Sequence, residues 1–189
     1  MQPARVNLPV VPGTTYRDIV RLMQPEFAYR AVDAVAGAPV RLTVPGHGLV
    51  GSWPVWVRGA VGMPALNVEP PRQNPHRAVV VDANTLEINA LSAEGLAARG
   101  GQLIYKLPVD LAGAEVAMRF SRGADTLLTL SLGQGLESPA PGTITRELTP
   151  AQTALLTGAW CYTLQVTFSD GSVTRYYDGG PTAGCSHAC

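Results

Sequence analysis

The end of the chain holds the side chains with the greatest capacity for chemistry, Cys185 and Cys189 with His187 between them. Thiolate and imidazole are ligands that zinc prefers, but a tetrahedral zinc site needs a fourth ligand. No Cys-x-x-Cys pair supplies that ligand, so we expect no metal site within one chain. A site shared between chains stays open.

Disulfide formation is the other chemistry available to these thiols. The chain has three cysteines, and an odd number leaves at least one thiol for a partner chain in an oxidising medium. We therefore predict interchain disulfides from Cys185 and Cys189, with Cys189 favoured because it is the last residue. Two alternatives stay open: Cys185 closes back on Cys161, or the thiols are inert in a disordered end.

His47 is the one candidate for a catalytic base that lies in a motif, Pro45-Gly-His-Gly48, because histidine titrates near neutral pH. No nucleophile or carboxylate motif accompanies it, so we expect its ring to pack or hydrogen-bond across a glycine-rich corner. His76 follows a proline and is expected in solvent. The acidic residues stand singly, and Glu87 is expected to face outward between the core residues Leu86 and Ile88. We predict no enzyme and no cofactor.

Aromatic residues offer a different kind of site, because sugars stack on exposed rings. Trp53 and Trp56 lie three positions apart in an expected strand and therefore point to opposite faces. We expect packing rather than a sugar or other small-molecule site for the set Trp53, Trp56, Trp160, Tyr176 and Tyr177.

Composition excludes several classes of partner. The 189 residues include 14 basic and 14 acidic side chains, so the formal net charge is zero and nothing suits a phosphate backbone. No apolar run is long enough for a membrane span, and residues 1–7 lack the pattern of a signal peptide. We expect synthesis in the cytoplasm without export, and neither nucleic acid nor membrane as partner.

Short runs rich in Val, Leu, Thr and aromatic residues recur between turn residues, which predicts an all-β chain of about a dozen strands. Residues 5–11 and 15–23 are expected to form a first hairpin, and residues 79–81 to pair with 86–88. In the strand 160–168 we expect Tyr162, Leu164, Val166 and Phe168 to face the core. Two short helices are expected, at 92–98 with Ser92 as N-cap and after Thr149.

Five short segments in the second half of the chain carry a resemblance. They are LPVDLAG (107–113), VAMR (116–119), LTPAQTA (148–154), YTLQV (162–166) and DGSV (170–173). Together with the strand pair expected at the beginning, they resemble the immunoglobulin-like N-terminal domain of siphophage upper-baseplate proteins. In that family the first strands lead almost at once to the LTG-type corner, whereas about eighty residues intervene here.

The intervening residues carry a second resemblance. The segments VPGHGL (44–49), VWVRG (55–59), VGMPALN (61–67) and VVDANTL (80–86) are similar to a small β-barrel repeat of phage tail proteins. That repeat is related to the first catalytic-cysteine half-domain of ubiquitin-activating enzymes, and in phages it is a structural module without adenylation chemistry.

The two resemblances imply an immunoglobulin-like β-sandwich formed by residues 1–29 and 106–180, with a small β-barrel module inserted at 30–105. Residues 181–189 are expected to form a cysteine-containing tail. The implied function is that of a non-enzymatic structural protein of a tailed-phage virion, in the neck, collar or tail baseplate. Its expected partners are copies of itself and other virion proteins. A capsid decoration protein and a receptor- or glycan-binding module of a tail fibre are the alternatives.

Overall fold

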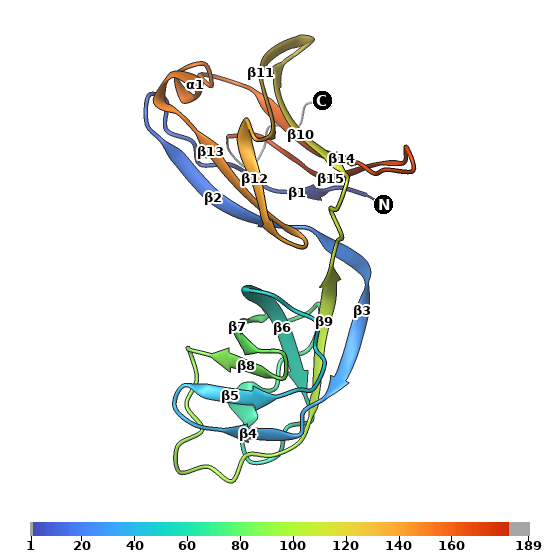
Figure 1. The fold of residues 1–189 in the computed structure, drawn as a ribbon. Helices are drawn as coiled ribbons and strands as arrows, with labels where there is room; N and C mark the ends of the chain where they lie inside the picture. The colour runs from blue at the N-terminus through green and yellow to red at the C-terminus, as the bar shows by residue number, and fades with distance from the viewer. Residues whose placement is uncertain (1, 182–189) are drawn as a thin grey trace. The chain divides into compact units, whose positions relative to one another are not determined.

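The computed structural model describes residues 2–181, and nearly all of its regular structure is β-strand. The all-β class predicted from the sequence is confirmed. The chain divides into two compact units (Figure 1): unit 1 takes residues 1–22 and 109–189, of which 2–22 and 109–181 are described, and unit 2 takes residues 23–108. The sequence placed these boundaries at 30 and 105, a few residues inside those of unit 2.

Hydrogen bonds link eight strands of unit 1 into one curled sheet of order β1-β15-β14-β10-β11-β12-β13-β2. Neighbouring strands are antiparallel except β1–β15 and β11–β12. The strands are β1 (Ala4–Arg5), β2 (Tyr16–Arg21), β10 (Glu115–Arg122), β11 (Asp125–Leu132), β12 (Gly135–Ala140), β13 (Thr143–Leu148), β14 (Cys161–Thr167) and β15 (Val173–Gly179).

The core of unit 1 follows from strict alternation in β14. Tyr162, Leu164 and Val166 are buried, while the residues between them are partly exposed, as the sequence predicted. The ring of Phe120 on β10 packs against the rings of Tyr162 and Trp160, with centroids 5.9 and 5.6 Å away. These large side chains give unit 1 a hydrophobic core of its own.

The hairpin expected for residues 5–11 and 15–23 does not form. The N–H of Val6 donates to the Asp178 carbonyl, so this segment continues along β15, while β2 pairs with β13. Gly179 permits the close approach, because a Cβ there would lie 2.0 Å from the Val6 carbonyl oxygen. The phenolic hydroxyl of Tyr162 adds a hydrogen bond to the same carbonyl at 2.7 Å. Contacts with β15, which is distant in sequence, therefore override the local turn signal.

One of the two expected helices is present. Thr149 caps α1 (Pro150–Ala154), and its hydroxyl accepts from the backbone N–H of Gln152, whose side chain accepts in return from the Thr149 N–H. The prediction of a helix at 92–98 is wrong, because Gly95 has a φ of +72° and ends the turn that Ser92 begins. The described residues hold no helix with the length and apolarity of a membrane span.

Unit 2 is a seven-stranded curled sheet of order β3-β9-β6-β7-β8-β5-β4. Its elements are β3 (Met23–Ala31), β4 (Ala34–Ala36), β5 (Val40–Thr43), β6 (Ser52–Arg58), the 3₁₀ turn η1 (Pro64–Leu66), β7 (His76–Asp82), β8 (Thr85–Ile88) and β9 (Gln102–Pro108). The expected β7–β8 hairpin is confirmed, with Val80 paired to Leu86. Trp53 lies in the core of this unit, where its indole N–H donates to the Lys106 carbonyl at 2.8 Å.

Candidate functional site

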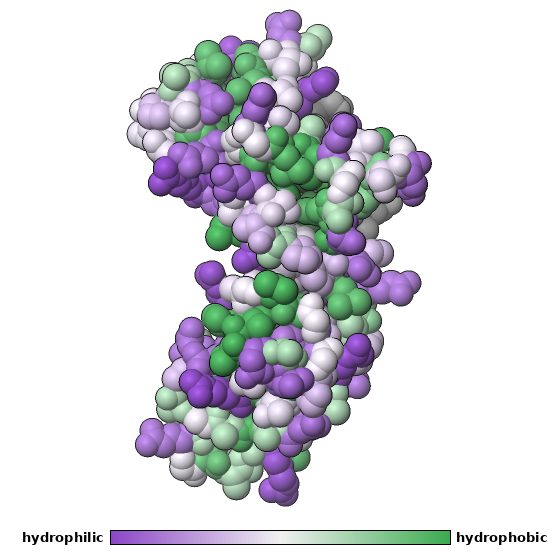
Figure 2. Space-filling model, in the orientation of Figure 1, coloured by the Kyte–Doolittle hydropathy of each residue, from purple (hydrophilic) through white to green (hydrophobic). Residues whose placement is uncertain are grey.

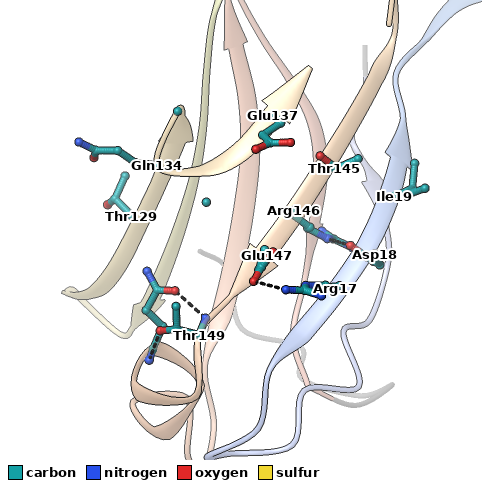
Figure 3. A pocket seen from close by; sticks show the side chains of 13 residues that line it. Arg17, Asp18, Ile19, Thr129, Gln134, Glu137, Thr145, Arg146, Glu147 and Thr149 are labelled. Carbon is teal, nitrogen blue, oxygen red and sulfur yellow. Dashed lines mark hydrogen bonds and ion pairs between the residues drawn. The ribbon is translucent and has the colours of Figure 1, made fainter. Parts of the chain in front are cut away.

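A groove of about 810 Å³ lies on unit 1, against β2, β13 and the turn between β11 and β12 (Figure 3). Alternation turns Arg17 and Ile19 of β2 and Thr145 and Glu147 of β13 away from the core. The rim includes Thr129, Gln134 and Glu137 from the neighbouring strands and turn. The Ile19 side chain is 54% exposed, so the groove combines charged, polar and apolar groups.

Two of the charged side chains that line this groove, Arg17 and Glu147, are paired with each other. Arg17 Nη2 lies 2.8 Å from Glu147 Oε1 across the β2–β13 pair. The hydrogen bond and charge of Arg17 lower the pKa of Glu147, and the same contact raises the pKa of Arg17. Among the described residues, neither histidine nor cysteine lines the groove.

A second ion pair, between the buried Arg146 and the partly exposed Asp18, lies on the core side of the same two strands. Arg146 of β13 donates from Nε and Nη2 to both carboxylate oxygens of Asp18 on β2. Its side chain is 3% exposed, its Nη1 approaches the Met118 sulfur at 3.8 Å, and its guanidinium lies 5.7 Å from the centre of the Tyr162 ring. This bidentate contact fixes β2 against β13 under the groove.

Tyr16 completes this polar cluster, because its hydroxyl donates to Asp18 Oδ2 at 2.9 Å. Burial, together with the hydrogen bond and charge of Asp18, raises the pKa of Tyr16 to about 12. Burial opposes the charge of Arg146, but the hydrogen bonds and charge of Asp18 raise the pKa of Arg146 overall. Both groups keep one protonation state across the physiological range, which indicates a structural role.

His47 has the structural role that the sequence predicted. It is buried, its Nδ1 accepts from the Leu49 N–H at 3.0 Å, and its Nε2–H therefore donates to the Asp82 carbonyl at 2.9 Å. The hydroxyl of Tyr105 donates to the His47 carbonyl at 2.6 Å. Both ring nitrogens are occupied in joining the glycine-rich corner to the β7–β8 turn.

The other expected polar positions lie apart from the groove. His76 is only partly exposed, and its Nε2 lies 3.0 Å from the Leu66 carbonyl, so the expectation of a solvated ring is wrong. Glu87 lies between the buried Leu86 and Ile88 as expected and pairs with Arg41 at 2.9 Å. Within residues 2–181, acidic, histidine and cysteine side chains form no group that could hold a metal ion.

Trp53 and Trp56 point to opposite faces, as predicted, but Trp56 belongs to an aromatic cluster that sequence reasoning missed. Its ring meets the ring of Phe27 edge-on at 5.7 Å, and Lys106 Nζ lies 5.1 Å above Phe27. Tyr29 and Trp56 both pair with Ile104, one from each neighbouring strand, so all three side chains lie on one face. We call Phe27, Tyr29 and Trp56 the aromatic face of unit 2.

The aromatic face is the more apolar of the two candidate surfaces. Ile104 is 1% exposed although it lies outside the core cluster of unit 2, since the aromatic face covers it. Tyr29 itself is 49% exposed. The alternation of Phe27 and Tyr29 in the sequence was the available signal. Their position near Trp56 depends on β9 pairing with both β3 and β6, and such contacts join segments distant in sequence. Figure 2 shows a further apolar patch on unit 2, over β6 and β7. Val81 on β7 and Val50, which precedes β6, are about half exposed.

The predicted interchain disulfide positions, Cys185 and Cys189, lie outside the described residues. Cys161 is disulfide-bonded, and its partner also lies outside them. Cys161 Sγ contacts the Ser121 hydroxyl at 3.3 Å on β10, beside the beginning of β14. Both pairings that the sequence left open therefore remain hypotheses.

Comparison with known proteins gives no relative: no protein-family model, no curated protein and no solved structure matches this chain.

Proposed function

We propose that this chain is a non-enzymatic structural component of a tailed-phage virion, located in the neck, collar or tail baseplate. It assembles by protein–protein contacts with copies of itself and with other virion proteins. One observation carries the proposal: within residues 2–181, the sheet of each unit has an edge strand that pairs on one side only and exposes a large apolar side chain, Ile19 on β2 and Tyr29 on β3. Monomeric β proteins block such edges, whereas assembling ones use them.

The chemistry of the described groups fits this function. The groove on unit 1 holds a salt-bridged pair, Arg17 and Glu147, and His47 is engaged at both ring nitrogens. A formal net charge of zero favours association between copies, because it provides little mutual repulsion. The resemblances to an immunoglobulin-like baseplate domain and to a phage tail barrel module supply the choice of a virion.

Disulfide stapling is part of the same proposal. Made in the host cytoplasm, the chain meets an oxidising medium only after lysis releases the particle. Whichever of Cys185 and Cys189 is not paired with Cys161 then joins a copy of the chain or a neighbour, and adds a covalent bond to interfaces that are individually modest.

Two alternatives share parts of this account. A capsid decoration protein would use the same open strands at a different place on the particle. A glycan-binding module of a tail fibre is favoured by the aromatic face, since Tyr29 and Trp56 offer ring surfaces next to Phe27, over which Lys106 Nζ lies. A glycan array probed with the purified chain separates this alternative, because the structural function predicts no bound sugar.

Quantitative mass spectrometry of density-banded particles tests the proposal. The expected result is that peptides of this chain follow the major capsid protein across gradient fractions at a constant ratio. Absence of the chain from intact particles, or its removal by washing at high salt, would overturn the proposal.

A further inference from the structure

β3 is the terminal strand of the unit 2 sheet, and β9 is its neighbour on one side only. The N–H of Val32 donates to the Gly101 carbonyl at 3.0 Å, which makes these two residues a hydrogen-bonded pair. Alternation in an antiparallel ladder then turns the backbone groups of Ala28 and Arg30 toward β9. The backbone groups of Phe27 and Tyr29 therefore face the open edge.

A side-chain contact agrees with that direction. Arg30 Nη1 donates to the Tyr29 carbonyl at 3.0 Å, so this carbonyl accepts from a side chain and is turned away from the ladder with β9. The contact is solvent-exposed, and a backbone N–H from an added strand can replace it at little loss. The edge thus presents donors and acceptors at the spacing that a further antiparallel strand requires.

The side chains along this edge can complement those of the same edge in a second copy of the chain. Phe27 and Tyr29 lie on the aromatic face, while Ala28 lies on the core side. Arg30 has the same parity as Ala28, and Glu26 lies within the register irregularity between Met23 and Phe27; both side chains are exposed. One strand therefore carries an aromatic pair on one face, a small residue and a base on the other, and an exposed acid next to Phe27.

We propose that β3 pairs antiparallel with β3 of a second copy of this chain. The two-fold axis passes between the two Ala28 residues, Phe27 of each copy lies opposite Tyr29 of the other, and Glu26 lies opposite Arg30. This register forms two aromatic pairs and two ion pairs, and it places opposite charges across the interface.

Neighbouring registers are poorer. The open edge allows shifts of two residues, because backbone groups alternate. A shift in one direction places Arg30 opposite Ala28 and loses both ion pairs. A shift in the other direction places Glu26 opposite Ala28 and Arg30 opposite Gln24, which also loses both ion pairs. The charge pattern thus selects a second copy in one alignment.

This inference rests on the proposed function and deepens it by naming one of its contacts. The test is sedimentation equilibrium of the full-length chain, with non-reducing gels to exclude disulfide-linked dimers. The wild type is expected to show a reversible dimer. Glu26→Arg and Arg30→Glu each place like charges opposite one another twice, and each should raise the dissociation constant at least about tenfold.

The double variant Glu26→Arg with Arg30→Glu restores both ion pairs and should return the dissociation constant to within about threefold of wild type. Arg72→Glu, a matched charge reversal in an exposed loop of the same unit, should leave the dimer unchanged. Circular dichroism verifies that each variant is folded. All three substituted positions are exposed, so the fold is expected to tolerate the substitutions.

A wild type that is monomeric at every concentration would overturn the inference, as would a double variant that stays as weak as the single ones. These results are separable from those for the virion. A monomeric chain that is nevertheless present in particles contradicts only the β3 pairing, whereas a dimeric chain absent from particles contradicts only the proposed function.

Discussion

Arg146 and Asp18 face each other across β13 and β2, and the guanidinium of the first donates to both carboxylate oxygens of the second. The two strands are far apart in sequence, and one of them is an edge of the sheet. The ion pair therefore holds an edge strand in place from beneath, while its outer side stays available to a partner.

Removing the carboxylate should destabilise unit 1 strongly. Asp18→Asn leaves the buried Arg146 without its counter-charge, and we expect the free energy of unfolding to fall by about 3 kcal/mol. Urea unfolding followed by fluorescence measures the change. Glu147→Gln removes the exposed partner of Arg17 and serves as the matched control, with stability expected to stay at the wild-type value. Equal effects of the two substitutions would contradict the assigned role of the buried pair.

Tyr16 gives the fold a predictable dependence on alkaline pH. Its pKa is raised from 10.0 to about 12 by burial and by the hydrogen bond to Asp18, so the folded state retains a proton that the unfolded state releases first. The stabilisation is complete below pH 10 and is lost as the pH rises from about 10 to about 12.

Urea titrations of wild type and Tyr16→Phe between pH 9 and pH 12 measure this contribution, because the tyrosines common to both proteins cancel in the difference. The stability difference between the two proteins should decrease over this interval. A difference that does not change with pH would show that Tyr16 has no special environment.

His47→Ala should lower the stability of unit 2. It leaves the Leu49 N–H and the Asp82 carbonyl without their partner in a buried corner, which costs about 2–3 kcal/mol. His76→Ala loses one hydrogen bond, to the Leu66 carbonyl, at a partly exposed position, and its effect should be smaller. Thermal unfolding of both variants decides, and a reversed order would contradict the structural role of His47.

Interchain disulfides should be visible directly in particles. Denaturing gels without reductant are expected to show a dimer band, or a heavier adduct with a neighbour, that collapses to a band at 19.9 kDa when reductant is added. Cys189→Ser should remove that heavier band, and replacing Cys185 as well should lower the heat resistance of the particle. Peptide mapping of the unreduced chain identifies the partner of Cys161. A monomer band in both lanes would remove the stapling role.

Local patterns were sufficient for part of the fold. Alternation in β14 identified Tyr162, Leu164 and Val166 as core, and Thr149 followed by proline identified the start of α1. In each case the signal and the structure lie within a few residues, so propensity and periodicity decide the outcome.

Other features depend on contacts between distant segments. Val6 donates to Asp178, which no pattern near either residue indicates, and the hairpin expected there does not form. Arg146 occupies a core position in β13 that an arginine normally avoids, and it becomes recognisable only when Asp18 is placed opposite. The meeting of Phe27 with Trp56 likewise requires the order of strands in unit 2. The candidate surfaces were therefore less accessible to sequence reasoning than the fold class.

The most direct test of a virion role is immunogold electron microscopy of purified particles with antibodies raised against the full-length chain. The account predicts gold at the neck, collar or baseplate in a fixed number per particle. Gold spread over the capsid faces would contradict that location and support the decoration alternative. The same antibody is also used on denatured gradient fractions. Particles that bind no gold, together with a denatured chain found only in fractions that contain no particles, would contradict the central claim.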